Sequence, residues 1–184
     1  STEAFWIQTF GNPEDFYLYQ GGAFVNTGYA FDANFSVRTG IKVTLLENFD
    51  KFNFLVDAQS SPLQRVRTYI REYVTRSNVT LENAYMHWFG KIASNTYAQA
   101  YGGYLETMFA GVGAEVLYQP VDSQLSFGLD LNYVKQRDFD SDTALFDYKV
   151  LTGHASVYWQ PKFLDDMLIT VSAGQFLAKD KGVN

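Results

Sequence analysis

The sequence predicts an all-β fold: an antiparallel transmembrane β-barrel, or a segment of about ten strands from a larger barrel. The first observation is residues 125–133, LSFGLDLNY, in which apolar residues alternate with small and polar ones. Successive side chains of a strand point to opposite faces, so this segment has one apolar and one polar face. The second observation is that the alternation recurs along the chain with almost no helical pattern. An apolar sheet face without covering helices must pack against another sheet or face lipid.

Composition is the third observation. The mean hydropathy is −0.16, and no segment approaches the ~18 apolar residues that a membrane-spanning helix needs. Alternating barrel strands average to a similarly neutral hydropathy, so this value is compatible with a membrane barrel. Aromatic residues make up 17% of the 184 residues. They favour strands and also the boundary between membrane and water.

The expected strands follow one another closely. Residues 16–30 are rich in aromatics and interrupted by glycines, and 35–46 place Ile41 and Val43 on the face opposite Arg38 and Lys42. Alternation then predicts strands over 65–75, 81–92, 97–105, 112–119, 125–136, 148–159 and 168–177. Helix is the competing interpretation for 66–74 and 81–88, where caps and β-branched content favour strand. Residues 47–64 are weakly patterned and predict a loop, with a short strand near 52–56 as an alternative.

The lengths of the connections between these strands indicate which end of the barrel would face outside the cell. Residues 120–123 and 161–166 are short and turn-like, whereas 137–147 are longer and acidic. Outer-membrane barrels alternate short periplasmic turns with longer external loops, which would place Asp138, Asp140 and Asp142 outside the cell. The long segment 47–64 then falls on the side expected for short turns, unless it contains another strand.

Several site chemistries are excluded or disfavoured. The net charge of −6 disfavours nucleic acid as a partner, and the lack of cysteine excludes disulfides and thiolate sites. The two histidines form no zinc motif. The three aspartates above have the spacing of a calcium loop, but Thr143 and Lys149 replace its glycine and glutamate, so a solvated acidic loop is favoured over a loop cation site. We expect no cofactor and no bound metal.

A polar set would line the interior if the barrel is correct. Its members are Arg38, Lys42, Arg67, Arg71, Glu115, Asp130, Asn132, Gln136 and His154. Mixed charges in a wet interior suit a path for hydrated, polar cargo, or they pair across strands and fill a narrow interior. A Ser-His-acid site at His154 would need Ser126 or Ser172 with Asp130 or Glu115. No spacing singles out a nucleophile, so we expect no enzyme.

Longer blocks of the sequence resemble a known family. They are GGYLETMFAGVGAEVLYQP (102–120), DLNYVKQRDFD (130–140), LTGHASVYW (151–159) and VSAGQFLAKDKG (171–182). Weaker similarity covers VRTGIKVTLLENFD (37–50) and LQRVRTYIREY (63–73). Together they resemble the YjbH/GfcD family of exopolysaccharide and capsule proteins. The resemblance implies an outer-membrane β-barrel of Gram-negative bacteria for secretion or assembly of an extracellular polysaccharide. It supplies no catalytic residue.

The resemblance also bears on completeness and partners. Members of that family are longer than this chain, so we expect residues 1–184 to form a single barrel segment of a larger protein. Its edge strands would pair with further sequence or another chain, because lipid does not tolerate open sheet edges. The implied partners are polysaccharide, outer-membrane lipid and, by analogy, periplasmic or lipoprotein export partners. The alternatives are a barrel enzyme that modifies lipid or glycan, and a soluble β-barrel or sandwich that binds a small ligand.

Overall fold

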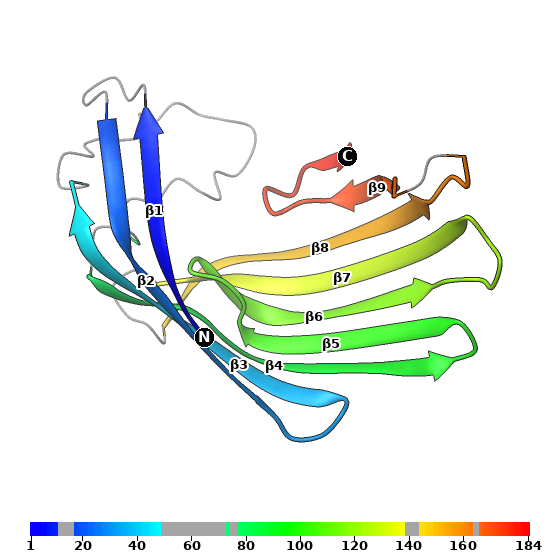
Figure 1. Cartoon of the computed structure of the whole chain (residues 1–184), viewed down its shortest axis with the longest axis horizontal. Coiled ribbons are helices and arrows are strands. Elements are labelled where there is room, and N and C mark those ends of the chain that lie inside the picture. The colour runs from blue at the N-terminus through cyan, green and yellow to red at the C-terminus, as the bar shows by residue number, and fades with distance from the viewer. Residues whose placement is uncertain (11–16, 49–72, 74–76, 139–143, 164–165) are drawn as a thin grey trace.

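A computed structural model of the chain describes residues 1–10, 17–48, 73, 77–138, 144–163 and 166–184. One antiparallel sheet of ten strands contains all its described strands, in the order of the sequence (Figure 1). The strands are β1 (Thr2–Phe10), β2 (Tyr17–Ala30), β3 (Phe35–Glu47), β4 (Val79–Ala93), β5 (Thr96–Tyr104), β6 (Phe109–Tyr118), β7 (Leu125–Arg137), β8 (Leu145–Trp159), β9 (Ile169–Gln175) and β10 (Lys181–Val183).

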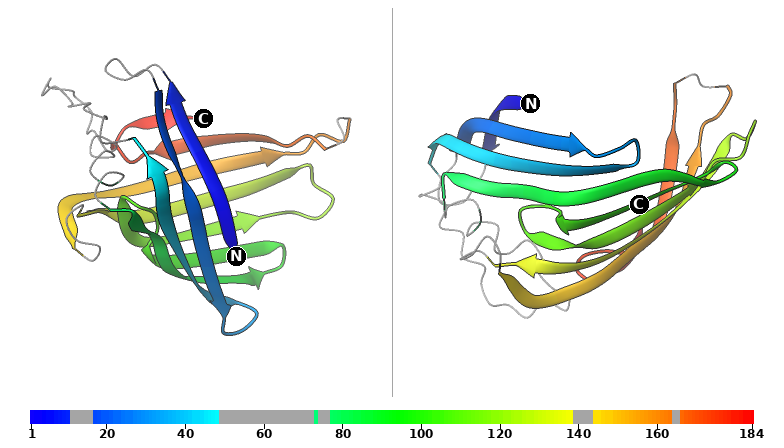
Figure 2. Two further views of the ribbon diagram at one scale, coloured as in Figure 1. Left: turned by 60° about the vertical axis from the view of Figure 1, so that its left-hand side comes forward. Right: turned by 90° about the horizontal axis from the view of Figure 1, so that it is seen from below.

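The all-β antiparallel class is confirmed, whereas closure into a barrel is not. Strands β1 and β10 are the two edges of the sheet and do not pair with each other. β10 contains only Lys181–Val183, so it presents a much shorter edge than β1, which runs from Thr2 to Phe10. Figure 2 shows the sheet twisted and curved into an open trough. No helix in the described ranges is long and apolar enough to cross a membrane.

The predicted strands agree with the structure over most of the sheet. The segments expected from 16–46 and from 81–177 correspond to β2, β3 and β4 to β9, and β4 excludes the helical alternative for 81–88. β1 and β10 were not predicted. In β1 the consecutive apolar residues Phe5, Trp6 and Ile7 hide the alternation. The strands expected at 52–56 and 65–75 lie outside the described residues, apart from Tyr73.

The pairing of β3 with β4 corrects the expected placement of the long segment after β3. These strands are direct neighbours, with Phe35 opposite Trp88, and no described strand lies between them. β3 and β7 run in the same direction, because an even number of antiparallel steps separates them. The connections 48–78 and 138–144 therefore leave the same end of the sheet, and the short turns at 31–34, 94–95 and 119–124 lie at the other end.

The two faces of the sheet differ as the alternation predicts. On β7 the apolar row is exposed, whereas Ser126, Gly128, Asp130 and Asn132 between its members are half-buried. We call the face that carries the apolar row the outer face, and the opposite face the polar face. The polar face is the concave one, since side chains from non-neighbouring strands contact each other there, as Tyr101 on β5 and Asn132 on β7 do.

A small apolar core lies on the polar face, toward the end of the sheet where β5 ends and β6 begins. It consists of Tyr73, Met108, Phe109, Val134 and Val150, with Leu105, Tyr148 and Leu177 packed against it. Beside it, Nη1 of Arg137 donates to the carbonyl oxygens of Leu81 and Glu106, each at 2.9 Å. The guanidinium of Arg137 also lies 4.9 Å from the centre of the Tyr104 ring. The hydrogen bonds of Arg137 therefore tie the start of β4 and the β5–β6 turn to the end of β7.

Candidate functional site

The strand register gathers four residues of the predicted polar set at the middle of the trough. Glu115 on β6 is opposite Asp130 on β7, and Asp130 is opposite His154 on β8. Asn132 follows two positions later on β7, so it points to the same face. Directly opposed residues of antiparallel strands share a face, which is why these side chains meet although they are distant in the sequence.

Hydrogen bonds extend this group to β4 and β5. Nε2 of Gln99 donates to Oε2 of Glu115 at 2.5 Å, and Oε1 of Gln99 lies 2.9 Å from Nε2 of His87. A carboxylate only accepts, so the amide nitrogen of Gln99 faces Glu115 and its oxygen faces the histidine. His87 therefore carries a proton on Nε2, which leaves Nδ1 of the neutral ring as an acceptor.

The remaining hydrogen bonds of this group lead to the carboxylate of Asp130. The Tyr101 hydroxyl donates to Oδ1 of Asn132 at 2.6 Å, and Nδ2 of Asn132 donates to Oδ2 of Asp130 at 3.0 Å. Nδ1 of His154 lies 3.2 Å from Oδ1 of Asp130, so it is the protonated ring nitrogen. The resulting polar row is defined as His87, Gln99, Glu115, Asp130 and His154, with one member on each strand from β4 to β8.

The other predicted site residues do not join this row. Lys42 is buried on β3, where Nζ donates to Oε1 of Gln20 at 2.5 Å and lies 5.0 Å from the centre of the Phe5 ring. Gln136 is buried near the end of β7. Arg38 is exposed on β3 and reaches the neighbourhood of His87. Arg67 and Arg71 lie outside the described residues.

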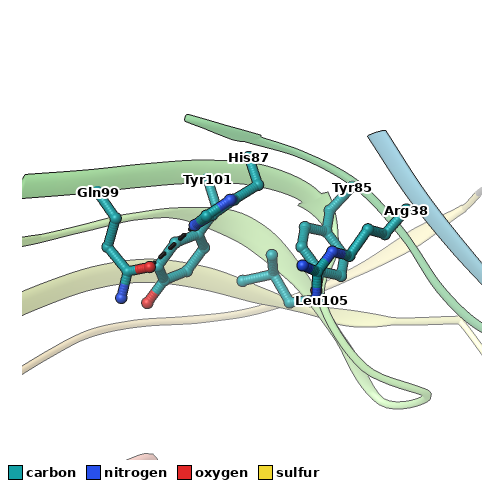
Figure 3. Close-up of a pocket in the computed structure, with 6 residues that line it drawn as sticks. All are labelled: Arg38, Tyr85, His87, Gln99, Tyr101 and Leu105. Atoms are coloured by element: carbon teal, nitrogen blue, oxygen red, sulfur yellow. Dashed lines mark hydrogen bonds between the residues drawn. The ribbon is translucent and has the colours of Figure 1, made fainter. Parts of the chain in front are cut away.

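Two adjoining cavities open beside the polar row. The first has a volume of about 480 Å³ and is lined by Arg38, Tyr85, His87, Gln99, Tyr101 and Leu105 (Figure 3). The second, of about 340 Å³, is lined by Phe89, Tyr97, Gln99, Glu115, Leu117 and Gln119. Gln99 lines both, so the cavities are neighbours along β4 and β5. Both volumes lie in the range of ~300–1,000 Å³ that is typical of small-molecule sites.

His87 on β4 and the β5 residues of this site were not among the predicted site residues. Alternation places Tyr97, Gln99 and Tyr101 on one face of their strand, but it does not say which face is the polar one. That assignment needs the register with β6, in which Gln99 is opposite Glu115. The information that the sequence lacked was therefore the register that pairs Gln99 with the carboxylate of Glu115.

The site has part of the geometry of a histidine base. Asp130 holds Nδ1 of His154, as an orienting carboxylate does in a Ser-His-acid arrangement. The serine that such a site would need is not bonded to His154 among the described residues. Oγ of Ser172 pairs with Oγ of Ser156 at 2.7 Å, Ser126 is opposite Tyr158, and the hydrogen-bond partner of His154 there is Asp130. Over the same residues, no group of three histidine or carboxylate side chains is arranged to hold a metal ion.

Comparison with known proteins identifies a family and a curated relative. Residues 1–184 match the model of the YjbH family, described as exopolysaccharide biosynthesis protein YbjH. The chain is also 49% identical over 179 residues to a protein named uncharacterized lipoprotein YjbH from Escherichia coli (strain K12). That alignment covers 95% of this chain and 25% of the relative, so the chain spans about a quarter of the relative's length. No solved structure matches the chain. Because the family match covers every residue, the chain belongs to the YjbH family of exopolysaccharide biosynthesis proteins.

Proposed function

We propose that this chain forms part of the wall of an outer-membrane β-barrel that serves the secretion or assembly of an extracellular or capsular polysaccharide. The outer face would contact lipid, and the polar face would line the passage for the polysaccharide. Membership of an exopolysaccharide biosynthesis family supports a polysaccharide as the transported molecule. The opposed chemistry of the two sheet faces supports the arrangement in the membrane.

The observation that carries the proposal is the polar row across five neighbouring strands. It runs from His87 to His154 on the concave face and includes both hydrogen-bond donors and carboxylate acceptors. A polysaccharide presents many hydroxyl groups, each of which donates and accepts. A passage for such a chain needs exchangeable polar partners rather than an apolar wall, and the lumen of a membrane barrel is polar for the same reason.

The outer face has the dimensions expected of a lipid-facing band. Leu125, Phe127, Leu129, Leu131 and Tyr133 are all exposed. The eight steps from the first to the last span about 26 Å at ~3.3 Å per residue. A strand tilt of ~40° reduces this to about 20 Å, close to the apolar band of ~25 Å in outer-membrane barrels.

Both borders of this band match a membrane boundary. At one end, Lys135 on β7 is directly opposite Lys149 on β8, immediately beyond Tyr133 and Leu151. Two lysines side by side stay hydrated and would mark the limit of the lipid region. At the other end, Trp159 is exposed opposite Leu125 and Tyr118 is exposed opposite Phe127, and aromatic residues of barrels gather at the interface.

The proposal sets a requirement for the sheet edges. Lipid does not hydrate backbone groups, so the outer edges of β1 and β10 would have to pair with strands outside residues 1–184. Those strands would belong to the same protein or to another chain. Periplasmic or lipoprotein partners would deliver the polysaccharide to the passage.

Deletion of the gene tests the proposed role. Synthesis should continue while the polysaccharide on the cell surface falls, with material retained inside the envelope, and the full-length gene should restore export. Unchanged surface polysaccharide in the deletion strain would contradict the proposal. Heat-modifiable migration of the full-length protein on a detergent gel tests the membrane barrel, and a protein that stays monodisperse in water without detergent would support the soluble alternative.

The pairing of His154 with Asp130 keeps a barrel enzyme as the second candidate. A His154→Ala variant separates the two functions. An enzyme would lose its activity with the base, so export or modification would be abolished although the protein folds normally. A passage has many equivalent polar partners and would retain most of its export.

A further inference from the structure

We propose that the cavity beside Arg38 is a subsite for an acidic sugar residue, whose carboxylate binds the Arg38 guanidinium. The sugar hydroxyls would bind Nδ1 of His87 and the hydroxyl of Tyr85. This inference rests on the proposed function and adds to it the chemical class of the polysaccharide: one that carries carboxylates.

The charge of Arg38 indicates an anionic ligand. Its side chain is exposed on the polar face, and among the described residues no carboxylate lies within ion-pair distance of it. Its cross-strand neighbours are Gly28 on β2 and Tyr85 on β4, neither of which is charged. A guanidinium presents a planar fork of donors that matches a carboxylate, so an anionic group is the ligand that fits it.

The hydrogen bonds around His87 determine which of its ring nitrogens accepts. The bond from Gln99 to Glu115 orients the Gln99 amide, and that amide in turn keeps the proton of His87 on Nε2. Nδ1 is then an acceptor, and His87 lines the cavity that Arg38 also lines. An acceptor and a cationic donor in one cavity suit a ligand with both hydroxyl and carboxylate groups, which a uronic acid has.

The walls of the cavity are partly aromatic. Tyr85 and Tyr101 line the same cavity, so aromatic rings stand beside the polar groups, as Figure 3 shows. In the adjoining cavity the rings of Phe89 and Tyr97 stack with their centres 6.3 Å apart and their planes 1° from parallel. Flat apolar surfaces next to a few convergent polar groups are the usual composition of a small-molecule site.

The two cavities differ in charge, and this difference narrows the chemical class of the ligand. The first contains Arg38, whereas Glu115 lines the second. A carboxylate would be attracted in the first cavity and repelled in the second. The two subsites together therefore favour a saccharide in which an acidic residue is followed by a neutral one.

Binding to the full-length protein in detergent tests this subsite. The probe is a tetrasaccharide of alternating glucuronate and N-acetylglucosamine, compared with its carboxyl-reduced form, which differs only in the acid groups. We expect the acidic form to bind at least about tenfold more tightly at low salt, since a charge-assisted bond is lost in the reduced form. Absence of binding by the acidic form, or equal binding of both forms, would overturn the inference.

Three variants locate the effect. Arg38→Gln should abolish the preference for the acidic form, whereas Lys91→Gln removes the same charge from the polar face of β4, outside both cavities, and should retain it. Tyr85→Phe keeps the ring and should weaken binding of both forms severalfold. Equal losses in Arg38→Gln and Lys91→Gln would show general attraction to a basic surface and would contradict the subsite. Unchanged heat-modifiable migration confirms the fold of each variant.

Export assays distinguish failure of the subsite from failure of the proposed function. If the deletion strain loses surface polysaccharide while Arg38→Gln leaves the acid preference intact, the subsite is wrong and the passage stands. If the deletion strain exports normally, the proposed function is wrong whatever the binding assay shows. Acid-selective binding that depends on Arg38, together with loss of export on deletion, supports both.

Discussion

Asp130 and His154 face each other from the adjacent strands β7 and β8, with 3.2 Å between Oδ1 of the aspartate and Nδ1 of the histidine. The same carboxylate accepts from the amide of Asn132 at 3.0 Å, and that amide oxygen accepts from Tyr101. Asp130 is thus the acceptor for hydrogen bonds that arrive from both sides along the trough. Its removal tests the integrity of the polar face.

Asp130→Ala should lower the free energy of unfolding by about 1–3 kcal/mol, because two half-buried donors lose their acceptor. Urea unfolding of the full-length protein in detergent measures this. Asp147→Ala is the matched control, since Asp147 is an exposed aspartate on the outer face of β8. Equal destabilisation by the two substitutions would contradict the role assigned to Asp130.

Gly113→Ala should disrupt the contact between Tyr101 and Asn132. A methyl group at this position on β6 would overlap Oδ1 of Asn132 and lie 2.5 Å from the Tyr101 ring. Such overpacking costs about 1–3 kcal/mol of stability. Gly28→Ala is the control, because the nearest atom to its added methyl is the Val37 carbonyl oxygen at 3.6 Å, an ordinary contact. A stable Gly113→Ala variant would show that the two side chains do not occupy this space.

Arginine substitutions on the outer face should follow the depth of the position in the bilayer. Leu129 is the central member of the exposed apolar row on β7, and Tyr133 is its last. Leu129→Arg should cost about 2–4 kcal/mol and Tyr133→Arg about 0–1 kcal/mol in lipid vesicles. Reversible unfolding of the full-length protein from vesicles measures the difference. Equal, small effects would indicate that this row does not face lipid.

Tyr73 should make stability depend on pH in alkaline solution. Burial raises the pKa of its phenol, against the opposing effects of the Gln136 hydrogen bond and the Arg137 charge. A group whose pKa is higher in the folded state stabilises the fold below its unfolded pKa of about 10 and loses that contribution as the pH rises through the folded pKa. The wild type should therefore lose stability above about pH 10.

Tyr73→Phe isolates this contribution. The variant lacks the hydroxyl that donates to the Arg137 carbonyl, so it should be less stable than the wild type by about 1 kcal/mol near neutral pH. The gap should narrow as the pH exceeds about 10, where the wild-type phenol ionises. Tyr118→Phe, at an exposed position at the end of β6, serves as the control. A gap that stays constant with pH would contradict the prediction.

Much of the sheet could be predicted because alternation is a local property. The apolar row from Leu125 to Tyr133 and the polar positions between its members are visible in the sequence, and both lie on the faces expected. β1 was missed because both of its faces carry large apolar side chains, as Phe5 and Trp6 do. The place of the segment after β3 was missed because strand order depends on pairing between distant segments, which alternation does not specify.

In the candidate site, too, some features follow from local alternation and others depend on pairing between distant strands. Alternation alone predicts Glu115, Asp130, Asn132 and His154 on the polar face, because each belongs to a strand whose opposite, apolar face is recognisable in the sequence. The packing of the strands in space was needed to show that Gln99 joins His87 to Glu115, and that Lys42 and Gln136 are buried elsewhere. Those contacts depend on register, on bulges such as that between Gly40 and Ile41, and on curvature. Each of these is set by hydrogen bonds between strands, and no single strand encodes them.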